Sequence, residues 1–230
     1  RTAPNFSPAS DKANATMFDE VFSARSIDPD QIPAEVVDSI LLSDDVYYAS
    51  LGGKSKSVGF AYADGAIKWR ATGSKAYTQT GVCRSLFPDL PLKDMAVLVE
   101  GEFDAVALRS CGYDAYSVPA GANISKDTEP PQFLVPVLRA LSEDKIDVVL
   151  AVDSDEKGKD FQKKLLHFLG RRRVGVIDWS KYGVKDANEC LATHGESGIK
   201  NAFQEVQNIL YEGIVRARSV ATTISDIRIG

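Results

Sequence analysis

The second half of the chain alternates short apolar runs with amphipathic stretches. The apolar runs are rich in β-branched residues, as in strands that are buried on both faces of a parallel sheet. They predict strands at residues 95–99, 115–118, 146–152 and 174–177. Between the strands, apolar residues recur at three- and four-residue spacing. They predict helices from Phe103, after Pro131, after Gly158 and from about Glu196. This order predicts a parallel α/β sheet.

The first half has the period-two alternation that is typical of antiparallel strands. Residues 58–63 and 66–70 flank Asp64-Gly65, a dipeptide that favours a two-residue hairpin turn. Further strands are predicted at 46–49 and 76–79. Residues 1–15 show no periodicity and are rich in Pro, Ala, Ser and Asn, as in linkers. The predicted fold is therefore α/β (α+β overall), a mainly antiparallel β subdomain followed by a parallel-sheet domain. The predicted segments are a linker at 1–15, a basic β-rich subdomain at 16–92, the parallel-sheet domain at 93–195, and a helix and connector at 196–230.

Acidic residues follow the predicted strands of the second half. Glu100 and Asp104 follow one strand, Asp153 and Asp155 follow another, and Asp186 comes after the last. The carboxyl ends of parallel strands meet at one edge of a sheet, so these side chains are expected to lie close together. Carboxylates that crowd each other repel, and a divalent cation with oxygen ligands relieves the repulsion. Each motif alone is weak, because a lone D-x-D is commonly a solvated loop.

Charge is distributed unevenly along the chain. The net charge is −5, yet six basic residues and only one acidic residue lie between Lys54 and Arg84. On the predicted strand 66–70, Lys68 and Arg70 share one face, and Lys75 follows. This basic face favours binding of phosphates opposite the acidic edge, although a merely solvated sheet surface has the same pattern.

Other residue types exclude several classes of function. The three cysteines are far apart in sequence, which excludes a disulfide framework and a zinc site within this chain. No apolar run is long enough to span a membrane, so no membrane partner is expected. A G-x-x-x-x-G-K-[ST] phosphate-binding loop is also missing, which argues against helicase activity in this piece.

Three motifs together resemble a known family. Residues 100–105 (EGEFDA), 153–158 (DSDEKG) and 185–189 (KDANE) resemble, in this order, the motifs of TOPRIM domains. These domains occur in primases, topoisomerases and certain nucleases. The KDANE segment and the turn 119–122 are most similar to the primase half of phage-type primase-helicases, whose mitochondrial relative is Twinkle. Upstream, residues 68–81 resemble the basic strand region of the same family.

This resemblance implies a DNA primase, an RNA polymerase domain that makes short RNA primers on single-stranded DNA. Its substrates would be ribonucleoside triphosphates and its cofactor Mg²⁺, with Mn²⁺ as a substitute and no zinc in this fragment. Asp153 and Asp155 would be the principal metal ligands and Glu100 a ligand or acid/base. Asp104 and Asp186 would be supporting or second-metal ligands. The residues expected to bind nucleotide or DNA are Lys68, Arg70, Lys75, Lys185 and Asn188.

The family also suggests what surrounds this piece. We expect a zinc-binding module N-terminal to it and a helicase domain C-terminal to it in the parent protein. Three alternatives remain. The same acids would serve a TOPRIM nuclease, or they would be vestigial in a DNA-binding or assembly module of a Twinkle-like helicase. An unrelated α/β domain with an acidic pocket, such as a response-regulator receiver, fits the β-rich first half poorly.

Overall fold

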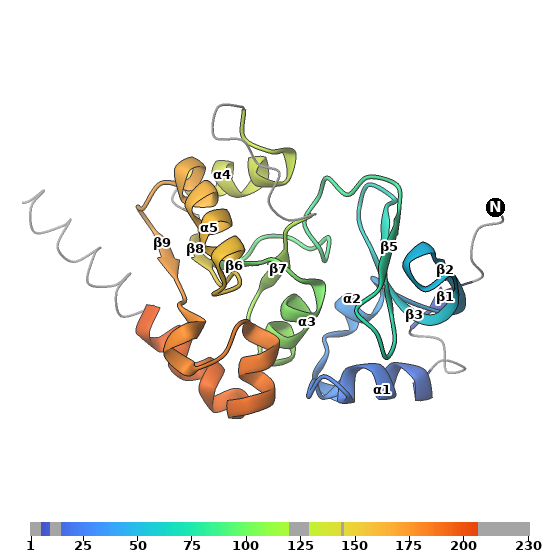
Figure 1. Ribbon diagram of the computed structural model, residues 1–230. Helices are drawn as coiled ribbons and strands as arrows, with labels where there is room; N and C mark the ends of the chain where they lie inside the picture. Colours follow the sequence, from blue (N-terminus) through green and yellow to red (C-terminus); the bar gives the residue numbers. More distant parts are fainter. Residues whose placement is uncertain (1–5, 10–14, 120–128, 144, 207–230) are drawn as a thin grey trace, which may run out of the picture.

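The computed structural model describes residues 6–9, 15–119, 129–143 and 145–206. They form two sheets, an antiparallel one in the first half and a parallel one in the second, with helices packed around and between them (Figure 1). The mixed α/β architecture predicted from the sequence is therefore confirmed. Within these residues, no helix has the length and apolar character needed to cross a lipid bilayer.

The first sheet has five antiparallel strands in sequence order. They are β1 (Ser7–Pro8), β2 (Ile40–Tyr48), β3 (Gly53–Ala61), β4 (Ile67–Ala71) and β5 (Tyr77–Thr80). The helices of this half are α1 (Ala15–Ser23), α2 (Ala34–Val37), η2 (Pro29–Gln31) and η3 (Ala49–Leu51). Two predictions need correction. Ser7 and Pro8 of the predicted linker pair with Leu42 and Leu41 of β2, and β2 begins at Ile40 rather than at residue 46.

The β3–β4 hairpin forms where Asp64-Gly65 predicted it, but its loop has three residues instead of two. The N–H of Tyr62 donates to the Ala66 carbonyl at 2.9 Å, and the N–H of Gly65 donates to the Tyr62 carbonyl at 2.9 Å. Gly65 has a φ of 78°, the left-handed backbone with which three-residue loops close. The Asp64 carboxylate accepts the N–H groups of Arg84 and Ser85 and so ties the hairpin to the later connection.

The second sheet has four parallel strands, as the alternation of strands and helices predicted, and their order is β7-β6-β8-β9. The strands are β6 (Met95–Val99), β7 (Ala115–Ser117), β8 (Asp147–Leu150) and β9 (Val174–Val176). The helices of this half are α3 (Glu102–Ser110), η4 (Gln132–Leu134), α4 (Val135–Ser142), α5 (Glu156–Leu169), η5 (Trp179–Tyr182) and the helical segment 187–206.

The helical segment 187–206 begins earlier than the predicted start near Glu196. Asp186 caps it, because its Oδ1 accepts the N–H of Glu189 at 2.8 Å, and Oε2 of Glu189 accepts the N–H of Lys185 at 2.6 Å. Gly195 within this segment has a φ of 64°, so only the part after this glycine was recognised from the sequence. The expected continuation of this helix beyond residue 206, and the turn residues 120–122, lie outside the described residues.

The two halves share one hydrophobic core. The Phe60 ring of β3 contacts the Phe103 ring of α3 edge to face, at 5.1 Å between centroids. Phe22 of α1 lies 5.7 Å from Phe103, and Phe60 lies 5.2 Å from Phe87. Helix α3 therefore packs between the sheets, and the predicted boundary at residues 92 and 93 does not separate two cores.

A buried ionic cluster also joins the halves. Glu102 of α3 is 1 % exposed; it accepts hydrogen bonds from Lys68 Nζ and from the Tyr62 hydroxyl, both at 2.6 Å. Arg70 Nη2 lies 3.7 Å from the second oxygen of Glu102. Burial by itself would raise the pKa of Glu102, but Lys68, Tyr62 and Arg70 lower it overall. The basic face predicted for strand 66–70 is therefore not open to solvent or phosphate at Lys68, because α3 covers it and Lys68 is only 9 % exposed.

We predict that Glu102→Gln lowers the free energy of unfolding by about 3–5 kcal/mol at neutral pH, because it leaves Lys68 buried without a counter-charge. The lowered pKa of Glu102 means that its contribution is present above the unfolded value of 4.5 and is lost as the pH falls through the folded value. The loss of stability in the variant, relative to the parent, should therefore be smaller in acid. Urea unfolding at pH 7 and at about pH 3, which lies well below the unfolded value, measures both effects.

The matched control for this prediction is Glu35→Gln, an exposed glutamate of α2. Its substitution should change stability by less than about 0.5 kcal/mol. A Glu102→Gln variant that unfolds like this control, or whose deficit is the same at both pH values, would contradict the role assigned to the buried cluster.

Candidate metal centre and adjoining groove

Three aspartates meet at the carboxyl edge of the parallel sheet. Asp104 lies in the first turn of α3 after β6, Asp153 follows β8, and Asp186 caps the helical segment 187–206. One carboxylate oxygen from each lies within 4.8 Å of the others. The structure therefore brings together acids from a stretch of more than 80 residues of sequence, as the strand-end argument predicted.

The electrostatics of the three aspartates fit a cation. Burial raises the pKa of Asp104 well above its usual range, the charge of Asp186 adds to the effect, and the N–H of Asn188, at 2.9 Å, opposes it. Burial likewise raises the pKa of Asp153. A purely oxygen donor set of clustered carboxylates matches the preference of Mg²⁺. These residues would hold such an ion.

Glu100 lies beside the three aspartates, at the end of β6. Its Oε1 accepts the N–H of Asp153 at 3.3 Å. Burial raises the pKa of Glu100 to about 7, and the negative charge of Asp153 acts in the same direction. A carboxyl group that titrates near neutrality can take up or release a proton during a reaction, which fits either of the roles expected for it.

Asp155 is the N-cap residue of α5. Its Oδ1 accepts the N–H of Gly158 at 2.9 Å, which caps α5 and lowers the pKa of Asp155. The loop is so tight that a Cβ on Gly158 would lie 2.1 Å from the Asp153 carbonyl oxygen. Only glycine fits at this position, and the D-x-D loop depends on it. Asp155 as a principal metal ligand stays a prediction.

Lys185, in the loop before residue 187, forms ion pairs with two of the acidic residues. Its Nζ lies 2.7 Å from Asp153 Oδ2 and 3.3 Å from Asp155 Oδ2. Its carbonyl accepts the N–H of Ser154 at 2.8 Å, and the Ser154 hydroxyl donates to the Val184 carbonyl at 3.1 Å. The hydrogen bond to Asp153 raises the pKa of Lys185. The loops after β8 and before residue 187 are thus bonded to each other.

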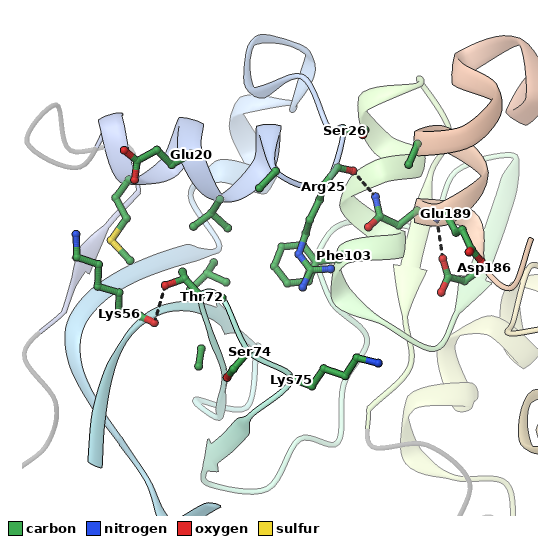
Figure 2. Close-up of a pocket in the computed structure, with 18 residues that line it drawn as sticks. Glu20, Arg25, Ser26, Lys56, Thr72, Ser74, Lys75, Phe103, Asp186 and Glu189 are labelled. Atoms are coloured by element: carbon green, nitrogen blue, oxygen red, sulfur yellow. Dashed lines mark hydrogen bonds between the residues drawn. The ribbon is translucent and has the colours of Figure 1, made fainter. Parts of the chain in front are cut away.

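A groove of about 730 Å³ adjoins these acids, between α1, the β4–β5 turn and the start of the helical segment 187–206 (Figure 2). The Arg25 side chain extends into it from the chain just after α1, and its guanidinium carbon lies 3.6 Å from the centroid of the Phe103 ring. Burial lowers the pKa of Arg25, and Asp104 and Asp186 oppose this. Lys75 and Asp186 also line the groove, so cations and carboxylates face the same space.

The remaining predicted binding residues are distributed differently. Lys68 is buried on Glu102, and Arg70 lies between Glu102 and the exposed ring of Tyr77, 5.2 Å from its centroid. The side-chain amide of Asn188 donates to the Arg25 carbonyl at 2.8 Å and so connects the two walls of the groove.

Two residues of the site were not found from the sequence. Glu102 could have been suspected from its position in EGEFDA, two residues after Glu100, but nothing in the sequence paired it with a lysine of the other half. Arg25 carries no such signal, because it stands in a segment without a recognisable motif. Both are revealed by the packing of α3.

Comparison with family models matches residues 97–191 to the Toprim-like family. No curated protein matches the sequence. Among solved structures, the primase fragment of the bacteriophage T7 primase-helicase is similar with a TM-score of 0.58 and 19% identity, over 79% of this chain and 72% of that one. The T7 gp4 primase domains, solved with the lagging-strand DNA polymerase and bound to an RNA/DNA hybrid and dTTP, are similar with a TM-score of 0.56 and 22% identity. This match covers 78% of this chain and 88% of that one.

A third solved structure contains the zinc-binding and RNA polymerase domains of the Aquifex aeolicus primase. It is similar with a TM-score of 0.52 and 17% identity, over 86% of this chain and 57% of that one. Identities this low establish a shared fold. The matched range 97–191 contains Glu100 and the three aspartates of the candidate metal centre. Residues 97–191 therefore match the Toprim-like family model, and most of the chain shares the fold of the primase domains in these structures.

Proposed function

We propose that this chain is a Mg²⁺-dependent RNA polymerase domain that synthesises short RNA primers on single-stranded DNA. One observation carries the proposal: Asp104, Asp153 and Asp186 converge beside a groove into which Arg25 and Lys75 project. An acidic wall for a metal ion and a basic wall for phosphates are what nucleotidyl transfer needs.

Each residue would have a distinct task. A bound Mg²⁺ would activate the attacking 3′-hydroxyl and stabilise the leaving pyrophosphate. Asp104, Asp153 and Asp186 would hold the ion. Glu100, with a pKa of about 7, would accept the proton of the attacking hydroxyl. Arg25 and Lys75 would bind phosphate oxygens of the nucleotide or template in the groove.

The similar structures support this choice of partners. The T7 primase domains were solved in a complex with a DNA polymerase, an RNA/DNA hybrid and dTTP, so the same fold occurs there together with nucleic acid and a nucleoside triphosphate. A zinc-binding module before this segment and a helicase domain after it remain predictions, as do the segment boundaries 1–15, 16–92, 93–195 and 196–230.

We predict that the chain, incubated with single-stranded DNA, labelled ribonucleotides and Mg²⁺, yields oligoribonucleotides. Asp153→Asn should reduce the yield by about 100-fold or more, because a metal ligand supplies several kcal/mol of transition-state stabilisation. Glu156→Gln removes an exposed carboxylate next to Asp155 and is the matched control, with an expected yield near that of the parent. Circular dichroism should show native folding for both variants.

Other outcomes of this assay would overturn the proposal. Shortened DNA or RNA strands without primer synthesis would indicate a nuclease. Binding of DNA without synthesis or cleavage would indicate a non-catalytic module. An Asp153→Asn variant that synthesises RNA as fast as the parent would show that this metal centre is not needed for the reaction.

We predict that Arg25→Ala raises the KM for ribonucleotides roughly tenfold or weakens the affinity for single-stranded DNA roughly tenfold. Either change corresponds to the binding energy of one charge-assisted hydrogen bond to phosphate. A DNA contact would also reduce the salt dependence of binding, whereas a nucleotide contact would not. Arg171→Ala, an exposed arginine just after α5, is the control. Unchanged KM and unchanged DNA affinity in Arg25→Ala would exclude Arg25 from phosphate binding.

A further inference from the structure

Lys185 is placed where a cation of the metal centre would be expected. Its ammonium contacts Asp153 Oδ2 at 2.7 Å and Asp155 Oδ2 at 3.3 Å, and Asp153 is also one of the three clustered aspartates. We propose that Lys185 is an internal counter-ion of this centre, which neutralises the D-x-D carboxylates in the metal-free chain and is displaced when a divalent cation binds. The inference rests on the metal centre of the proposed function but not on primer synthesis.

The first step is electrostatic competition. A carboxylate has lone pairs enough for two partners, but an ammonium and a divalent ion on the same carboxylate repel each other strongly at these distances. Asp153 is half-buried, with its side chain 18% exposed, so water screens this repulsion only in part. The two cations therefore compete for Asp153.

The second step concerns what is able to move. The Lys185 backbone is held at both of its polar groups: its carbonyl accepts the N–H of Ser154, and its N–H donates to Glu189 at 2.6 Å. Its side chain, in contrast, is 49% exposed and carries the charge on a flexible four-carbon stem. The ammonium can leave while both loops stay in place.

The third step is what the displacement provides. Asp155 keeps its Oδ1 on the N–H of Gly158, so only its Oδ2 is engaged by Lys185. Departure of the ammonium frees Oδ2 of both Asp153 and Asp155 as ligand atoms on the same side of the loop. Without metal, the same ammonium relieves the repulsion between these carboxylates.

The test is a titration with Mn²⁺, in which electron paramagnetic resonance counts the free ion and Mg²⁺ is the competitor. Lys185→Met keeps the length of the side chain without its charge and should bind the ion roughly fivefold more tightly, equivalent to about 1 kcal/mol. Lys185→Arg keeps the charge and should bind within about twofold of the parent. Lys157→Met removes an exposed charge of the first turn of α5 and should also match the parent.

A second measurement uses the unmodified chain and needs no variant to fold. The rate at which an amine-reactive ester acylates Lys185, read by mass spectrometry, should rise when saturating Mg²⁺ replaces a chelator, because the amine leaves its ion pairs. The rate at Lys157 should not rise. Lys185 acylation that is equal in Mg²⁺ and chelator, or Mn²⁺ affinity that is unchanged or weaker in Lys185→Met, would overturn the proposal. Absence of primer synthesis with both expected results would refute the proposed function alone.

Discussion

Mutual repulsion of carboxylates is the constraint on which this structure depends. A parallel sheet gathers its strand ends at one edge, and here the chain places acids at several of them. Local countercharges and helix dipoles reduce this repulsion. First-turn N–H groups of two helices donate to Asp155 and Asp186, and the Lys185 ammonium bridges Asp153 and Asp155. The edge is thus stable enough to form and still retains carboxylate oxygens for a cation.

The acidic edge would be of little use without the first half of the chain. Helix α3 carries Asp104 toward the acids, Glu102 toward the antiparallel sheet and Phe103 into the shared core. One short helix therefore sets the position of the basic wall relative to the acidic wall. The dependence is mutual, because the face of β4 that carries Lys68 would be a solvated surface if α3 did not cover it.

The sequence predicted best what depends on local periodicity and on chain order. The parallel strands, the Asp-Gly hairpin and the meeting of acids at strand ends follow from patterns within short windows. Contacts between distant segments were not predictable in this way. The pairing of Lys68 with Glu102 depends on how α3 packs on the sheet. The start of a helix at residue 187 depends on the Asp186 side chain, which accepts the N–H of Glu189, and on the Glu189 side chain, which accepts the N–H of Lys185. The position of Arg25 follows only from the shared core.

Asn188 has a consequence for how a substrate would be admitted. Its backbone N–H holds Asp104 and its side chain holds the Arg25 carbonyl, so one residue is bonded to the acidic wall and to the basic wall at once. Together with the shared aromatic core and the Glu102 cluster, these two hydrogen bonds hold the walls of the groove in one relative position. Adjustment to an incoming ligand is then left to long side chains at the rim and not to a hinge between domains.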